Sequence, residues 1–201
     1  MSDLFAEESA MQWIALGQSR LGIQRTFLSD HQSWYEQLVR EVTWEQPEVN
    51  LYGKRHKVPR LTAFQGDEGV SYQYSGLRHE ASGWSPTLHL MKNRIDSLLG
   101  TRFNTVLLNW YRNGLDTMGF HADDERELGE NPVIASVSLG SDRRFVIKRR
   151  DNNKIKREIV LSGGSLLVMA DRFQREWLHG IPADKRLTSG RINLTFRQVL
   201  V

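Results

Sequence analysis

Two residues with metal-binding side chains, His121 and Asp123, are separated by a single alanine. Alternate side chains of a β-strand point to the same face, so this spacing brings an imidazole and a carboxylate close enough to hold one ion. His179, near the end of a later expected strand, is the natural third ligand. Two histidines and one carboxylate leave three positions of an octahedral ion open, which is typical of non-haem iron(II) oxygenases. Zinc hydrolases use the same types of ligand, so these residues alone leave the metal undecided.

A segment that alternates strictly between polar and apolar residues, 191–197, follows soon after His179. Its polar face carries Arg191, Asn193, Thr195 and Arg197. A guanidinium pairs with a carboxylate through two hydrogen bonds and stays charged, so two arginines on one face indicate a dicarboxylate site. A surface strand would show the same alternation, and it is the neighbouring metal ligands that favour the functional interpretation.

Asn109 and Tyr111 supply a matching face on an expected strand, residues 103–111. They are two residues apart and therefore point together, and an amide with a phenol can complete the hydrogen bonds around a carboxylate. A zinc hydrolase has no need of a dicarboxylate site. The combined residues therefore favour iron(II) with a dicarboxylate cosubstrate.

The composition of the chain limits its class. Its 201 residues suit one domain with a sizeable core, and the formal net charge of +3 permits a polyanionic partner without requiring one. There is no cysteine, which excludes disulfides and thiolate metal ligands. The N-terminus does not have the pattern of a secretory signal, and no apolar run approaches the ~20 residues of a membrane span. We therefore expect a soluble, cytoplasmic monomer that does not bind membranes.

Two helices are expected in the first half of the chain. Ser29 would cap one that covers residues 30–42, with Gln32 three residues on as in a capping box. The second is better marked, because Ser85 caps it, Pro86 takes its first turn and Gly100 ends it.

From residue 103 onward the pattern changes to short strands separated by turn signals. The expected strands cover residues 103–111, 119–123, 133–140, 143–149, 155–161, 165–170, 175–179 and 191–199. Short strands without intervening helices argue for an antiparallel double sheet, so the expected fold is mainly β with flanking helices (α+β), a jelly-roll barrel. The expected plan is an N-terminal helical extension, residues 1–50, before one structural domain, residues 51–201.

The order and spacing of these motifs resemble the AlkB family of nucleic-acid demethylases. The resemblance rests on His121-x-Asp123, His179, Asn109-x-Tyr111 and Arg191-x-Asn193-Leu194-Thr195-Phe196-Arg197. It runs from about Leu51 to the C-terminus. It is strongest toward the animal enzymes that repair duplex DNA, through residues 121–128 and 51–60.

This resemblance implies a double-stranded β-helix and an oxidative demethylation in direct DNA repair. His121, Asp123 and His179 would bind iron(II), with 2-oxoglutarate and dioxygen as cosubstrates. The implied 2-oxoglutarate contacts are Asn109, Tyr111, Arg191, Asn193, Thr195 and Arg197. Arg191 would hold the far carboxylate and Arg197 would lie near the iron-side carboxylate, but which arginine takes which end is open. Methyl groups of bases such as 1-methyladenine and 3-methylcytosine would leave as formaldehyde.

The resemblance also implies how a base reaches the metal. A methyl group on the pairing edge is inaccessible within a duplex, so the nucleotide must flip out or the substrate must be single-stranded. The residues at positions that line the family's base pocket are Tyr72, Tyr74, Ser75, Glu125 and Arg60. The ordinary alternatives are half-buried tyrosines of a sheet and a solvated loop acid.

Tyr52 occupies the place of an aromatic wedge in the relatives that act on duplex DNA, where phenylalanine would be expected. An inserted ring can fill the gap left by a flipped base. The expected phosphate contacts are Lys54, Arg55, Lys57, Arg143, Arg144, Arg149 and Arg150. A charge run is usually a solvated face, and it is the neighbouring demethylase motifs that favour phosphate binding.

Other functions stay open on the sequence alone. The same chemistry could act on RNA or on another methylated substrate, and a nucleic-acid-binding module that has lost catalysis is a further alternative. The expected partner is nucleic acid, with DNA preferred. The expected site of action is the nucleoid in a bacterium or the nucleus in a eukaryote.

Overall fold

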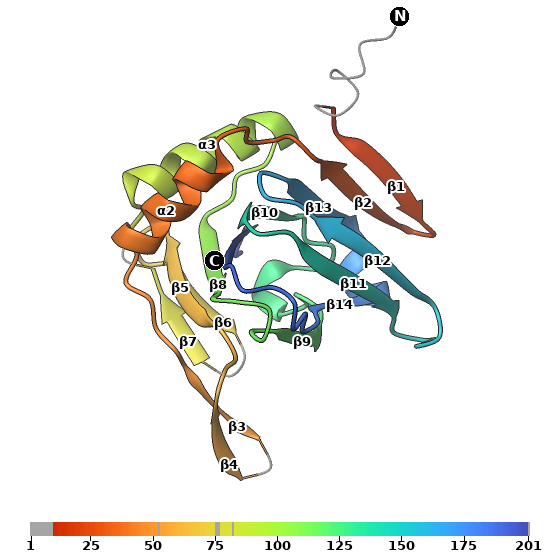
Figure 1. Ribbon diagram of the computed structural model, residues 1–201. Helices are drawn as coiled ribbons and strands as arrows, with labels where there is room; N and C mark the ends of the chain where they lie inside the picture. The colour runs from red at the N-terminus through yellow and green to blue at the C-terminus, as the bar shows by residue number, and fades with distance from the viewer. Residues whose placement is uncertain (1–9, 52, 75–76, 82, 201) are drawn as a thin grey trace, which may run out of the picture.

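A computed structural model describes residues 10–51, 53–74, 77–81 and 83–200 of the chain, and two antiparallel sheets make up its body (Figure 1). The larger sheet contains, in spatial order, β1 (Gln12–Leu16), β2 (Ser19–Gln24), β13 (Leu166–Asp171), β10 (Ile134–Gly140), β15 (Arg191–Arg197), β8 (Thr105–Tyr111) and β5 (Leu61–Gly66). The smaller sheet contains β12 (Lys156–Leu161), β11 (Arg143–Arg149), β14 (Trp177–Ile181) and β9 (Met118–His121). This arrangement confirms the expected jelly roll and the eight expected strands after residue 103, with some boundaries moved by one or two residues.

Two helices, α2 (His31–Glu41) and α3 (Pro86–Leu99), cover the outer face of the larger sheet (Figure 1). The expected signals of α3 are confirmed: the Ser85 hydroxyl accepts from the N–H of Leu88 at 3.4 Å, and Gly100 ends the helix at φ 67°. Asp30, rather than Ser29, precedes the first turn of α2, and it makes no side-chain cap hydrogen bond.

The alternation of β15 positions the site, because both faces of this strand are buried. Its apolar residues, Ile192, Leu194 and Phe196, pack in one core cluster with the buried side chains of α2 and α3. Its polar residues must therefore face the space between the two sheets. A second apolar cluster fills the rest of that space and joins residues of both sheets, including Leu107, Phe145 and Trp177.

The expected helical extension at the N-terminus is wrong for residues 12–24. These residues form the β1–β2 hairpin, and β2 pairs along its whole length with β13, so the larger sheet includes them. Gly17, at φ 74°, lies in the two-residue turn between Leu16 and Ser19. Because tight hairpin turns favour glycine at positive φ, this was a readable strand signal.

Two smaller hairpins and two short helical turns complete the described fold. The β3 (Glu48–Leu51) and β4 (Lys54–Lys57) hairpin projects away from the body, and β6 (Ser71–Tyr74) pairs with β7 (Leu77–Glu80) (Figure 1). The turns are η1 (Arg126–Leu128) and α4 (Phe173–Glu176). Tyr52 and Ser75 lie outside the described residues, as do the side chains of Lys54, Tyr72 and Tyr74. No helix in the described ranges is long and apolar enough to cross a membrane.

Candidate active site

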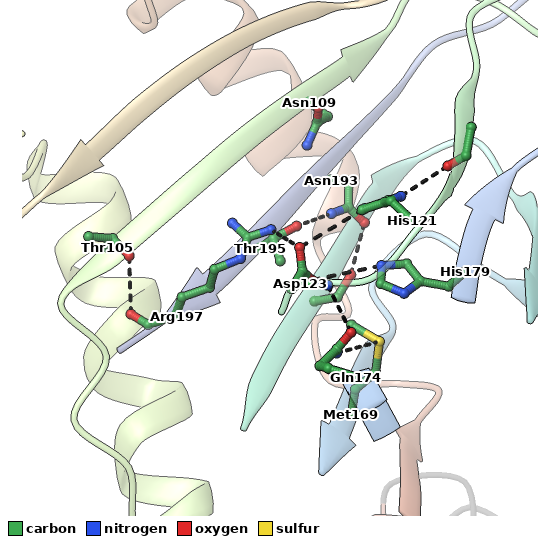
Figure 2. A network of polar contacts seen from close by, with 12 residues as sticks. Thr105, Asn109, His121, Asp123, Met169, Gln174, His179, Asn193, Thr195 and Arg197 are labelled. Carbon is green, nitrogen blue, oxygen red and sulfur yellow. Dashed lines mark hydrogen bonds and ion pairs between the residues drawn. The ribbon is translucent and has the colours of Figure 1, made fainter. Parts of the chain in front are cut away.

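The three expected metal ligands meet at one end of the smaller sheet (Figure 2). His179 on β14 lies directly opposite His121 on β9, and their ring centroids are 4.3 Å apart. Asp123 follows two residues after β9 ends, and its oxygens lie 4.0 Å from Nε2 of His121 and 3.7 Å from Nε2 of His179. One ligand atom from each residue lies within 4.8 Å of the others. This separation suits three ligands on one face of a metal ion.

The protonation states of the ligands fit a divalent cation. Burial alone would raise the pKa of the Asp123 carboxyl, but the charge of Arg197, the two histidines and the Arg197 hydrogen bond lower it to about 2. Burial and the neighbouring His121 lower the pKa of His179 to about 3. Near neutral pH the site therefore offers an ionised carboxylate and a neutral His179, which are the forms that bind metals. His121 Nδ1 lies 3.0 Å from the Gly119 carbonyl oxygen, and donation there leaves Nε2 as the ligand atom.

A cavity of about 40 Å³ extends from the metal ligands between the two sheets. Besides those ligands, its walls consist of Leu107, Asn109, Tyr111, Met118, Ser136, Phe145, Met169, Gly180, Ile181, Asn193, Thr195 and Arg197. One wall is therefore mostly apolar, and the other carries the polar face of β15. A small dicarboxylate would find apolar walls along its length and polar groups at its ends.

Arg191 is paired across β15 and β8 with Tyr111, which lines the cavity, but Arg191 itself lies behind that lining. Its side chain is 1% exposed, and Nη2 donates to Ser138 Oγ at 2.8 Å and to Asn193 Oδ1 at 2.6 Å. Nε and Nη1 have no hydrogen-bond partner within the described part of the chain. Burial lowers the pKa of this guanidinium to about 10, which still leaves it charged near neutral pH. A buried guanidinium with two donors that have no hydrogen-bond partner is stabilised by an anion, and a carboxylate has the geometry to bind it.

Two serines of β10 support this site, and the sequence analysis missed both. Ser138 accepts from Arg191, and Ser136 Oγ donates to Asn193 Oδ1 at 2.9 Å. Asn193 in turn donates to Thr195 Oγ1 at 2.7 Å, so these polar residues form one connected network. The signal was the spacing of the two serines, which puts both on one face of an expected strand.

Arg60 was expected near the damaged base, and the structure places it against Asn109. Its side chain is buried, and Nε donates to Asn109 Oδ1 at 2.7 Å. The amide oxygen of Asn109 is therefore occupied, and its NH₂ group is the part that a carboxylate in the cavity could use.

Arg143 was expected to contact phosphates, and the structure contradicts this. The residue is 3% exposed, and its guanidinium donates to the carbonyl oxygens of Asn113, Asp116 and Pro182 at 2.8–3.2 Å. The alternation of β11 turns this side chain inward. There it links the loop with Asn113 and Asp116 to the segment with Pro182. The expectation failed because charge alone does not tell which face of a strand carries it.

Apart from Lys54, whose side chain lies outside the described part, the other expected phosphate contacts lie at the surface, and most have acidic partners. Arg144, Arg149 and Arg150 form ion pairs with Glu158, Asp151 and Asp124 at 3.3, 2.6 and 2.7 Å. Arg55 on the β3–β4 hairpin has an 81% exposed side chain and lies 4.0 Å from Glu48, and Lys57 is exposed too. Glu125, expected to contact the base, lies two residues after the metal ligand Asp123 and is half-buried.

Comparisons with known proteins agree with this geometry. The sequence profile of the 2OG-Fe(II) oxygenase superfamily matches residues 22–197. The DNA oxidative demethylase ALKBH2 of Mus musculus is 41% identical over 172 residues, covering 82% of this chain and 72% of that protein. The alpha-ketoglutarate-dependent dioxygenase alkB homolog 3 of Bos taurus is 38% identical, covering 86% of this chain and 63% of that protein. The solved structure of OsALKBH1 superposes with a TM-score of 0.67 at 15% identity, covering 94% of this chain and all of that one, which supports the fold.

Proposed function

The chain belongs to the AlkB family within the 2OG-Fe(II) oxygenase superfamily, and on that premise we propose that it is a DNA-base demethylase. It would use iron(II), 2-oxoglutarate and dioxygen to remove N-methyl groups from bases of the 1-methyladenine and 3-methylcytosine type. Relatives similar over most of the chain carry the name DNA oxidative demethylase, which supports this reaction and substrate.

One observation carries the proposal: a buried ionised Asp123 lines the cavity, and a buried Arg191 with two unpaired nitrogens lies next to Tyr111 and Asn193 in its wall. The first group fits a metal ion, and the second fits the far carboxylate of a dicarboxylate. A zinc hydrolase would have no use for the second, and a module without catalysis would have no need to keep either desolvated group.

The residues of the cavity have separate tasks in this reaction. Bound iron(II) and 2-oxoglutarate would together supply the oxidation of the methyl group by dioxygen, with decarboxylation of the cosubstrate to succinate. His121, Asp123 and His179 would hold the metal on one face and leave the other face open. Arg191 would fix the far carboxylate with help from the Tyr111 phenol. The apolar wall would exclude water from the reacting methyl group.

DNA would approach the open side of the metal, and the target base would have to flip out of the helix. Glu125, Tyr72, Tyr74 and Ser75 are proposed to receive the base. The projecting β3–β4 hairpin is proposed to enter the duplex through Tyr52, with exposed cations such as Arg55 beside it on the phosphates. We propose action as a monomer, at the nucleoid or in the nucleus.

The test uses the purified full chain with iron(II), 2-oxoglutarate and ascorbate. Oligonucleotides of single- and double-stranded DNA and RNA carry 1-methyladenine or 3-methylcytosine, and mass spectrometry measures the repaired base and succinate. We expect repair of DNA, and no repair by His121→Ala. Absence of both products with every substrate would contradict the enzyme, and faster repair of RNA than of DNA would favour the RNA alternative.

A further inference from the structure

Gln174 is a buried side chain at the metal site to which the proposed reaction assigns no task. It lies in the short turn α4, between β13 and β14, and is 1% exposed. Its Oε1 accepts a 3.0 Å hydrogen bond from the backbone N–H of Asp123 (Figure 2). Asp123 lies beyond the last residue of β9, so the ladder of that strand does not reach this N–H group. The Gln174 side chain therefore supplies the hydrogen-bond acceptor that a neighbouring strand would otherwise give to the backbone N–H of Asp123.

The orientation of the Gln174 amide follows from this contact. A backbone N–H can only donate, so the amide must turn its oxygen toward Asp123. Its NH₂ group then meets Met169 Sδ at 3.5 Å, and a thioether is a weak acceptor. The amide thus gives up part of its hydrogen-bonding capacity inside the core. Stability alone would favour an apolar residue here, so the contact with Asp123 needs its own explanation.

A second connection joins α4 to the same loop. Arg150 donates through Nη1 to the Gln174 carbonyl at 3.2 Å and through Nη2 to Asp124 Oδ2 at 2.7 Å. The turn α4 leads directly into β14, which carries His179. The segment with Asp123 and the segment with His179 are therefore joined through Gln174 and Arg150, in addition to the pairing of β9 with β14.

We propose that Gln174 is a positioning residue for Asp123 that holds the metal ligands at the separation an ion requires. Arg197 anchors the carboxylate of Asp123 at 2.7 Å, whereas Gln174 anchors its backbone, so both ends of the ligand are held. Without the acceptor, a buried N–H group would lose its partner and the loop would shift to satisfy it. The inference rests on the iron site of the proposed function.

Three variants of the full chain test this role by direct metal binding. Gln174→Met removes the acceptor at similar volume, and Gln174→Glu keeps an oxygen in its place. The matched control is Gln65→Met, because Gln65 Oε1 also accepts from a backbone N–H, that of Ser85 at 2.8 Å, at the start of α3. Each protein is titrated with Co(II) alone and followed by visible absorption, with thermal unfolding measured in parallel.

We expect Gln174→Met to bind Co(II) roughly 10- to 100-fold more weakly, as is typical when a residue that orients a metal ligand is removed, with altered absorption bands. Gln174→Glu should retain most of the affinity, and Gln65→Met should bind as the wild type does. If Gln174→Met does not fold, Gln174→Ala takes its place with the same expected loss.

Two outcomes would overturn the inference and leave the iron site intact. One is wild-type affinity and absorption bands in Gln174→Met. The other is an equal loss of affinity in Gln174→Glu or Gln65→Met, which would mean that the acceptor at Asp123 is not the cause. A wild-type protein that bound no Co(II) would instead overturn the metal site itself, and with it the proposed function.

Discussion

Arg197 donates a 2.7 Å hydrogen bond through Nη2 to Oδ1 of Asp123, and both side chains are almost completely buried. The contact places one arginine of β15 beside the metal ligands, whereas Arg191 lies at the Tyr111 end with two idle nitrogens. The geometry therefore supports Arg191 as the partner of the far carboxylate and Arg197 as the neighbour of the metal side.

Arg197→Met should destabilise the metal-free protein by about 3 kcal/mol, because it leaves a buried carboxylate without its cation. A divalent cation should restore part of this loss, since it supplies the missing positive charge. Urea unfolding with and without Co(II) measures both effects. A variant as stable as the wild type without metal would contradict the importance of this ion pair.

Arg191→Met should raise the KM for 2-oxoglutarate about 10- to 100-fold, the cost of losing charge-assisted hydrogen bonds to a carboxylate. Affinity for Co(II) alone should not change, because Arg191 does not touch the metal ligands. Arg191→Lys should have a KM for 2-oxoglutarate between those of the wild type and Arg191→Met, since lysine keeps the charge and lacks the planar guanidinium. An unchanged KM would place the far carboxylate elsewhere.

Arg143→Met should lower the free energy of unfolding by about 2–4 kcal/mol, because three carbonyl oxygens lose a buried charged donor. Its neighbour Arg144 is the control, with a 42% exposed side chain that forms a surface ion pair. Arg144→Met should change stability by less than about 1 kcal/mol. Equal effects of the two substitutions in urea unfolding would argue against the structural role of Arg143.

The free energy of unfolding should depend on pH through the carboxyl group of Asp116. Burial by itself would raise the pKa of its carboxyl, but the hydrogen bonds and charge of Arg112 lower it below its ordinary value. A carboxyl with a lower pKa in the folded state stabilises the fold above its unfolded pKa, and this contribution is lost as the pH falls through the folded pKa. We expect Asp116→Asn to cost about 1–2 kcal/mol near pH 7.

That cost should shrink as the pH falls below the ordinary pKa of an aspartate, and it should vanish below the lower pKa of the folded protein, where the wild-type carboxyl also becomes neutral. Urea unfolding of both metal-free proteins across this range provides the measurement. A difference that stayed constant with pH would mean that the charge of Asp116 does not contribute.

Arg55→Met should weaken DNA binding through loss of a phosphate contact. The slope of log Kd against log salt concentration should fall by about 1, because one fewer counterion is released. Arg40→Met, on the exposed surface of α2, is the matched control and should leave the slope unchanged. The same slope in both variants would remove the β3–β4 hairpin from the DNA contact surface.

The sequence by itself determined the metal ligands, the polar face of β15, the jelly-roll class and the ends of α3. These features depend on local spacing, because side-chain direction in a strand or helix follows from the position in the chain. The family resemblance then connected the motifs to one reaction, which the matched profile and relatives support.

Only the tertiary structure decided which charges lie inside and which at the surface. From the sequence, Arg143 was expected to contact phosphates and Arg60 to lie near the damaged base. Both are instead buried against groups from distant parts of the chain. Gln174 lies 51 residues from Asp123, and β2 pairs with β13 across most of the chain. Burial and hydrogen bonding depend on which surfaces the fold brings together, and one segment does not contain that information.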